Sequence, residues 1–206
     1  MTPFSAPWRA ALEEAWTAYT EDSLPIGASI ADEHGTVLTR GRNRLGEGWR
    51  VAGVIGGHDL AHAEINALLA LESVPRPECR AWTVYTTVEP CPQCAGAVTM
   101  SGIRGLSFAA PDPWAGCADL LTTHPYMIRK GMQVKRAPAD VIRASLILMV
   151  HALLAEEQPV MSEIVASFVA LHPAEVERAG QLLRAGTVLE LRERCAGLDE
   201  VLGVLR

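Results

Sequence analysis

The chain has 206 residues, of which 49% are hydrophobic and 20% are charged, with a mean hydropathy of +0.15. This length can bury one good core, or one domain with a helical appendage. The net charge of −6 and the presence of only two lysines leave little surplus for the basic face with which a protein holds folded nucleic acid.

The first elements expected are a helix and a hairpin. From about residue 7 to 20, large apolar residues recur at intervals of three and four, as in an amphipathic helix with its aromatic side chains in the core. Residues 26–31 and 36–39 then predict two antiparallel strands joined by the turn Asp32-Glu33-His34-Gly35.

A glycine-rich connection runs from Gly41 to Ala61, and its length makes it a candidate binding loop. It contains Asn43, whose amide can donate and accept at once, as recognition of a heterocycle edge requires. Taken locally, Asn43 is more typical of a residue that closes a turn with its own backbone. Trp49, in the same loop, would stack on a ring or fill the core.

The next stretch alternates helices and strands. Residues 61–71 predict a helix, 81–88 a central strand, 91–101 a second helix ending at Gly102, and 105–109 another strand. This alternation is typical of a layered α/β sheet with parallel neighbours. The two helices should lie side by side so that their N-termini converge.

The region that follows is expected to hold a loop at 111–114 near the site, a short helix over 115–123 and a last strand at 132–135. It also carries the small basic cluster Arg129, Lys130, Lys135 and Arg136. Such a cluster is more often a solvated strand end than a phosphate contact.

Beyond Pro138 the pattern is almost purely helical. We therefore expect an α/β domain over 1–138 and an all-helical extension over 139–206. Residues 141–154 are apolar nearly all round, too short for a membrane span, and so expected to be buried in the fold or in a subunit interface. Helices are also predicted around 161–169, from 173 to about 186, and from 187 onward.

Two short motifs carry the chemistry: His62-Ala63-Glu64 and Pro90-Cys91-Pro92-Gln93-Cys94. Cys91 and Cys94 are three residues apart, which places both sulfurs on one face of a beginning helix, and Pro92 suits its first turn. The positive helix end favours thiolates. With His62 as the third ligand, these residues predict a zinc site.

Three protein ligands leave one tetrahedral position open for water, which is the mark of a catalytic zinc. Glu64, two residues from His62, would then take a proton from that water and pass it to a leaving amine. The alternative is a closed structural site in which Cys79, Cys117 or His58 provides a fourth ligand.

The odd number of cysteines, two of them at metal-ligand spacing, fits a reducing compartment better than a disulfide scaffold. The first residues lack the basic region and apolar core of a signal peptide. The expected location is cytosolic.

With these motifs in place, residues 4 to 136 resemble the cytidine deaminase-like superfamily, in the branch that holds bacterial tRNA adenosine deaminases, guanine deaminases and cytosine deaminases. The resemblance rests on 41–44, 46–49, 58–59, 61–68 and 87–97. It implies a three-layer α/β/α fold with a mixed five-stranded sheet, a homodimer, zinc at His62, Cys91 and Cys94, and Glu64 as the proton shuttle. It also implies that Asn43 reads the substrate. The other candidate substrate contacts are Ala63, Trp49, Trp114 and Asp112.

The function expected is zinc-dependent hydrolytic deamination of a small nucleobase or nucleoside, purine-type favoured, with release of ammonia. The sparse basic residues and the long helical tail favour a small ligand over tRNA, with no membrane partner. The alternatives are a tRNA adenosine deaminase, which converts adenosine to inosine, and a catalytically silent zinc-stapled interaction module. An inactive relative that serves as a regulatory subunit also stays open.

Overall fold

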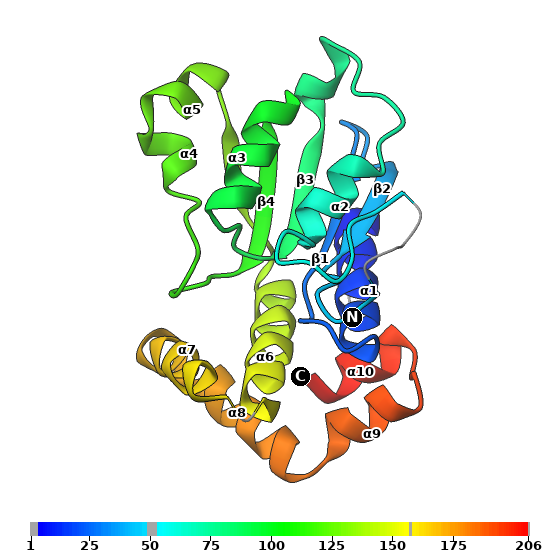
Figure 1. Cartoon of the computed structure of the whole chain (residues 1–206), viewed down its shortest axis with the longest axis vertical. Coiled ribbons are helices and arrows are strands. Elements are labelled where there is room, and N and C mark those ends of the chain that lie inside the picture. Colours follow the sequence, from blue (N-terminus) through cyan, green and yellow to red (C-terminus); the bar gives the residue numbers. More distant parts are fainter. Residues whose placement is uncertain (1–3, 49–52, 157, 206) are drawn as a thin grey trace.

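The computed structural model describes residues 4–48, 53–156 and 158–205. A five-stranded sheet lies at its centre (Figure 1), with strands in the order β2-β1-β3-β4-β5. The strands are β1 (Gly27–Ala31), β2 (Val37–Arg42), β3 (Thr83–Val88), β4 (Gly105–Ala110) and β5 (Gln133–Arg136). The β1–β2 hairpin is antiparallel, β1 is also antiparallel to β3, and β3, β4 and β5 are parallel. The expected mixed sheet is therefore confirmed, although Gly41 and Arg42 extend β2 into the segment predicted as loop.

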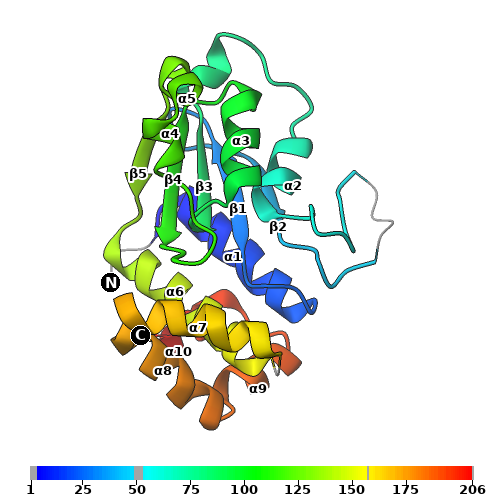
Figure 2. The same ribbon diagram turned by 60° about the vertical axis from the view of Figure 1, so that its left-hand side comes forward.

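Helices cover both faces of the sheet, which confirms the three-layer fold. The helices α2 (Ala63–Leu69) and α3 (Pro92–Ser101) pack on one face, and α1 (Ala6–Thr20) and α6 (Ala139–Ala155) on the other (Figures 1 and 2). Two separate apolar clusters follow from this arrangement. Val84 packs with α2 and α3, whereas its neighbour Tyr85 packs with α1 and α6, as the two-residue period of a strand requires.

The segment between β4 and β5 differs from the prediction of one short helix over 115–123. It forms two short helices, α4 (Leu120–Thr123) and α5 (Pro125–Lys130). Pro125 begins α5, and Gly131, with a φ of 69°, ends it in the left-handed conformation that favours glycine. A 3-10 turn, η1 (Glu78–Ala81), precedes β3.

The C-terminal extension consists of α6, α7 (Pro159–Leu171), α8 (Pro173–Arg184), α9 (Thr187–Glu193) and α10 (Leu198–Leu205). The single helix expected from residue 187 is wrong: Cys195 has a φ of 50°, and the chain turns there between α9 and α10. As expected, α6 is buried in the fold. Within the described ranges, no helix has the length and apolar character needed to cross a lipid bilayer.

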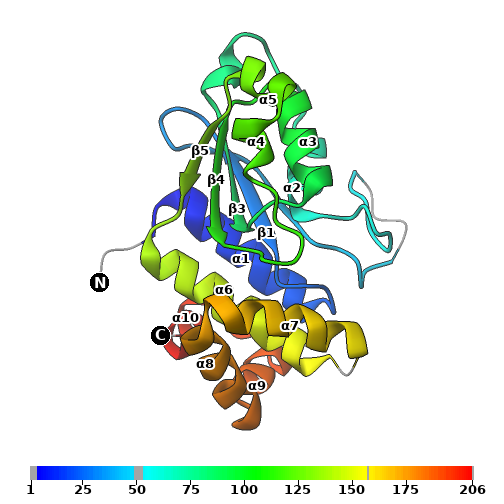
Figure 3. The same cartoon turned by 90° about the vertical axis from the view of Figure 1, so that its left-hand side faces the viewer.

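The extension packs against α1 as well as against itself (Figure 3). One apolar cluster joins Leu12 and Trp16 of α1 to side chains of α6, α8, α9 and α10. The buried Trp16 indole donates a hydrogen bond to the carbonyl oxygen of Ala196 at 2.6 Å, and the Arg192 guanidinium donates to the carbonyl oxygen of Tyr19. The aromatic face of α1 is therefore covered by the extension as well as by the sheet.

Candidate active site

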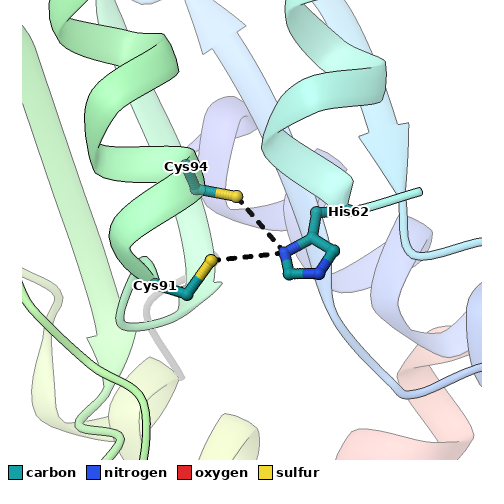
Figure 4. Close-up of side chains that lie close together, drawn as sticks. All are labelled: His62, Cys91 and Cys94. Carbon is teal, nitrogen blue, oxygen red and sulfur yellow. Dashed lines mark hydrogen bonds between the residues drawn. The ribbon is translucent and has the colours of Figure 1, made fainter. Parts of the chain in front are cut away.

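His62, Cys91 and Cys94 meet at the N-terminal ends of α2 and α3 (Figure 4). His62 is the residue that precedes α2, and Cys91 is the residue that precedes α3, so both helices begin at the site. The Nδ1 atom of His62 lies 3.4 Å from the Sγ of Cys91 and 3.4 Å from the Sγ of Cys94. The predicted convergence of the two helices is confirmed.

The donor set has the chemistry and the spacing that zinc prefers. In a tetrahedral site with Zn–S bonds near 2.3 Å and Zn–N bonds near 2.0 Å, sulfur and nitrogen ligands lie roughly 3.6 Å apart. Both Sγ–Nδ1 separations are close to that value, and all three ligand atoms lie within 4.8 Å of one another. The three side chains therefore fit one zinc ion.

The ionisation of the two cysteine thiols also favours a bound cation. Hydrogen bonding to Cys94 and then to His62 lowers the pKa of the Cys91 thiol to about 4. The neighbouring Cys91 sulfur, burial and the Glu64 carboxylate all raise the pKa of Cys94. Without a metal, the protein therefore stabilises the thiolate of Cys91 and disfavours a second thiolate at Cys94. A divalent cation between the two sulfurs would offset their repulsion and stabilise both thiolates.

The structural alternative required a fourth side chain. Among the described residues, the group of donors close enough to share a metal consists of His62, Cys91 and Cys94. Cys79 is buried in the cluster between α2, α3 and the sheet, and the Cys117 thiol points to the carbonyl oxygen of Pro90 at 3.5 Å. Neither these cysteines nor His58 belongs to that group, which favours an open coordination position.

Glu64 lies in the first turn of α2 and is almost completely buried, with 3% of its surface exposed. Burial raises the pKa of its carboxyl group. Its Oε1 accepts a hydrogen bond of 3.0 Å from the hydroxyl of Thr86, a fully buried residue of β3. The carboxylate is thereby held in one orientation beside the metal ligands.

A cavity of about 250 Å³ opens beside His62, Cys91 and Glu64. Its lining is mostly apolar, and it draws residues from the loop after β2, the loop after β4 and two helices of the extension. The contributions outside the motifs include Asn43, Leu45, Asp112, Trp114, Met149, Leu153, Met161 and Ile164. Such a lining, with a few convergent polar groups, is typical of a site for a small molecule.

Four of the five candidate substrate contacts line this cavity. Asn43 is buried, and its Oδ1 accepts a hydrogen bond from the backbone N–H of Leu45, so it does close a local turn. Within the described ranges, no hydrogen bond engages its amide NH₂ group, which can still serve a ligand. Ala63 is buried, and Trp114 is 51% exposed at the cavity. Trp49 lies outside the described residues.

Asp112 has a structural task in addition to its place at the cavity. Its Oδ1 accepts hydrogen bonds from the backbone N–H groups of Trp114 and Ala115, which shapes the loop after β4. Glu89 holds the same loop, because its two carboxylate oxygens accept from the N–H groups of Asp112 and Ala118. Glu89 was not among the residues predicted for the site; its place directly before the cysteine motif was the available signal.

Thr86 and Asn66 were also missed. Asn66 binds both the N–H and the carbonyl oxygen of Ile55 and donates to the carbonyl oxygen of Arg42, so it ties the long loop after β2 to α2. Both residues are polar groups within apolar patterns, and buried polar groups of this kind need partners. Which partners they find depends on the tertiary fold.

The family model described as the cytidine and deoxycytidylate deaminase zinc-binding region matches residues 4–110, about half of the chain. The tRNA-specific adenosine deaminase of Haemophilus influenzae is 37% identical over 105 residues, which are 50% of this chain and 56% of that protein. The corresponding Bacillus subtilis enzyme is 32% identical, over 59% of this chain and 70% of its own. The chain thus matches little more than half the length of the first of these relatives.

Solved structures of deaminases are also similar to this chain. A tRNA:A34 deaminase, which edits A to I at the wobble position of transfer RNA, is 27% identical with a TM-score of 0.54, over 70% of this chain and 99% of its own. A guanine deaminase from Nitrosomonas europaea, 23% identical with a TM-score of 0.53 over 74% and 85% of the two chains, shares the fold.

Proposed function

The chain belongs to the family of zinc-binding cytidine and deoxycytidylate deaminases, and from this premise we propose that it is a hydrolytic deaminase of a small nucleobase or nucleoside, purine-type favoured. The observation that carries the proposal is the arrangement of His62, Cys91, Cys94 and a buried Glu64 along one small, largely apolar cavity. That arrangement would provide three ligands for a metal, a proton carrier and a place for a flat ring.

Each residue has a defined task in the proposed reaction. Zinc, when bound by His62, Cys91 and Cys94, would supply a nucleophile near neutral pH by lowering the pKa of water. Glu64 would take a proton at its carboxylate and return it to the departing amine nitrogen, so that ammonia leaves. The NH₂ group of Asn43 would donate to the ring edge, and the exposed Trp114 would stack on its face.

The choice of a small substrate is supported by charge and by size. A chain of net charge −6 with two lysines has few groups with which to follow a phosphate backbone. The cavity of about 250 Å³ is also partly closed by the chain's own α6 and α7. A second candidate function, deamination of adenosine in tRNA, is favoured by the similarity to tRNA-specific adenosine deaminases.

A substrate panel separates these candidates. The zinc-loaded protein would be incubated with adenine, guanine and cytosine, with their ribonucleosides, and with a tRNA anticodon hairpin, while ammonia is measured. Release from a free base or nucleoside is the expected result. Turnover of the hairpin alone would establish the second candidate instead.

Replacement of Glu64 by Gln tests whether the site is catalytic. The substitution keeps the size of the side chain but removes the group that accepts a proton, so turnover should fall at least about a hundredfold. Zinc content, measured by plasma emission spectroscopy, and thermal stability should stay unchanged. A non-catalytic zinc module, or an inactive regulatory relative, would show no turnover in the parent protein, and an E64Q variant with full turnover would contradict the assigned role.

We also propose a homodimer and a cytosolic location. Self-association is supported by exposed apolar side chains on α3 and α5, namely Met100 and Ile128. A reducing compartment is supported by the five cysteines, all of which are free thiols. Light scattering of the purified protein would test the first point.

A further inference from the structure

One wall of the substrate cavity comes from the C-terminal extension. Met149 and Leu153 of α6 are buried there, and Met161 and Ile164 of α7 are half-buried. In the chain, all four follow the region that matches the family model, residues 4–110. Figures 2 and 3 show α7 lying across the end of the fold at which α2 and α3 begin. The extension therefore reaches the site directly.

A second cavity, of about 320 Å³, adjoins the first. Leu24, Leu45 and Met161 line both cavities, so these three side chains stand where the two spaces meet. Leu24 and Leu45 belong to the α/β layers, whereas Met161 comes from the first turn of α7. Met161 is thus the contribution of the extension to the boundary between the cavities.

The outer cavity differs in chemistry from the inner one. Asp22, Ser23, Glu156 and Gln158 line it, and all but Ser23 are exposed to solvent. Arg192 also lines it, but its guanidinium is engaged by the Asp22 carboxylate and the carbonyl oxygen of Tyr19. Hydroxyl-bearing groups suit this lining, whereas a phosphate would face two carboxylates and one cation that is already paired.

We propose that Met161 is a specificity-determining residue: the ring binds in the inner cavity, and a sugar attached to it passes Met161 into the outer cavity, so that this side chain sets how well a nucleoside is used relative to its base. The inference rests on the proposed deaminase function. It identifies the outer cavity as a subsite for a neutral sugar and excludes a phosphorylated or polymeric substituent.

The physical basis is the shape and flexibility of methionine. Its unbranched side chain has three rotatable bonds and can fill or leave an irregular gap. Shortening it to alanine would widen the passage between the cavities, and replacing it by phenylalanine would narrow the passage. Because a single methylene group more or less in an apolar pocket alters discrimination by about 10- to 200-fold, the effect of either substitution should be measurable.

The experiment compares kcat/KM for a base and its ribonucleoside, taken from whichever pair the parent protein deaminates best. The nucleoside-to-base ratio should rise at least about tenfold in Met161→Ala and fall by a similar factor in Met161→Phe. Val165→Ala is the matched control, since Val165 lies on the same helix and packs into the apolar core but lines neither cavity. It should leave the ratio unchanged, and the 5′-monophosphate should be a poorer substrate than the nucleoside.

Dissociation constants for the bases and ribonucleosides of the substrate panel, measured by calorimetry on the zinc-loaded proteins, distinguish failure of this inference from failure of the deaminase function. If ammonia is released but neither ratio responds to Met161, the inference is wrong and the deaminase function stands. If both ligands bind and the binding ratio follows Met161 without any ammonia release, the deaminase function is wrong and the subsite stands. If the ligands neither bind nor react, both fall. If Met161→Ala only disturbs the fold, kcat/KM should fall equally for base and nucleoside, and their ratio should not change. Met161→Phe then decides: an unchanged ratio in that variant as well contradicts the proposal, and a lower nucleoside-to-base ratio supports it.

Discussion

At the scale of single residues, Thr86 is the partner that fixes the orientation of Glu64. Its buried hydroxyl donates to the Glu64 carboxylate at 3.0 Å from the neighbouring strand β3. A hydrogen bond to a charged group contributes about 1.5 to 3 kcal/mol. Thr86 does not contact the reacting atoms in the proposed reaction, so its role there would be to position Glu64, the proposed proton carrier.

We predict that Thr86→Val lowers kcat roughly tenfold to a hundredfold, because the carboxylate loses its partner while the packing volume is kept. Thr86→Ser, which restores the hydroxyl, should recover most of the rate. Steady-state kinetics with the best substrate of the panel provides the measurement. Equal kcat in the parent protein and in T86V would show that Glu64 needs no support from β3.

His151 is a second informative residue, far from the metal donors in the chain. It is fully buried on α6, and its Nδ1 lies 3.0 Å from the hydroxyl of Tyr19 on α1. Its Nε2 is buried and has no hydrogen-bond partner among the described residues. Burial, and then the charge of Arg192, lower the pKa of His151 to about 4. The native state therefore holds this imidazole neutral.

We predict that stability decreases as the pH falls from about 6.5 toward 4. Over this window the unfolded chain binds a proton at His151 and the native state does not, so the free energy of unfolding falls by up to about 3 kcal/mol. Above pH 6.5 the contribution is complete. Urea unfolding at several pH values would measure the slope, and His151→Gln, which keeps a partner for Tyr19 but does not titrate, should show a flatter profile. An identical slope in H151Q would refute the assignment.

At the scale of elements, the close approach of β2 to α2 positions the helix that follows His62 and carries Glu64. A Cβ atom at Gly41 would lie 2.2 Å from the backbone nitrogen of Ala67 and 2.4 Å from the carbonyl oxygen of Ala63. Both contacts involve backbone that cannot rotate away. Only glycine allows α2, and with it His62 and Glu64, to rest this close to the sheet.

We predict that Gly41→Ala destabilises the protein by about 3 kcal/mol or more and weakens zinc binding, because α2 must move outward. Gly48→Ala is the control, since no atom lies within 4 Å of its would-be Cβ. Thermal unfolding and competition with a zinc chelator give the two readouts. Normal zinc affinity in G41A would indicate that the metal donors do not depend on this contact.

Elements with clear start and stop signals were predicted well. The cysteine helix begins at Pro92 and ends at Gly102, whose φ of 96° only glycine adopts readily, and both signals were read correctly. The break between α9 and α10 was missed because Cys195, at φ 50°, is not a residue type that marks a left-handed turn. Proline and glycine thus marked the ends of α3, whereas the same signals at Pro125 and Gly131 did not reveal the short helix α5.

The metal donors were predictable because spacing within one helix turn and order along the chain are properties of the sequence. The wall of the cavity that α6 and α7 provide was not predictable in this way. Met161 and Ile164 lie in the helical extension, outside the metal motifs and the candidate substrate contacts, and their place at the cavity depends on how α6 and α7 pack against the rest of the fold. No local pattern encodes that packing.

At the scale of the complete chain, the C-terminal extension packs into the same apolar core as α1. Trp16 is 5% exposed and is bonded to Ala196, and Arg9 forms two hydrogen bonds of 2.9 Å with Asp199 of α10. The exposed ion pair contributes little, about 1 kcal/mol at most. Burial of the large side chains on α1 contributes far more, about 1.5 to 3 kcal/mol each. The proposed boundary at residue 138 thus marks a change of composition within one packed structure.

We predict that a chain ending at residue 138 does not fold cooperatively. Loss of cover over Trp16 and its neighbours on α1 removes apolar burial comparable to the whole stability of a typical domain, about 5 to 15 kcal/mol. Circular dichroism during thermal unfolding should show a broad, shallow transition, whereas full-length Asp199→Asn should unfold sharply. A soluble fragment with a sharp transition and bound zinc would instead establish two independent domains.

His62 and Cys91, which meet in Figure 4, are 29 residues apart in the sequence. The chain between them includes β3, which pairs with β1 and β4 in the sheet. A chain that ends at α2 has the imidazole but neither thiol of the donor set, so the three donors lie together only when α3 is packed beside α2. Capture of the metal therefore follows tertiary assembly. In any purified batch, the molar ratio of zinc to polypeptide should report the fraction of molecules that reached the correct architecture.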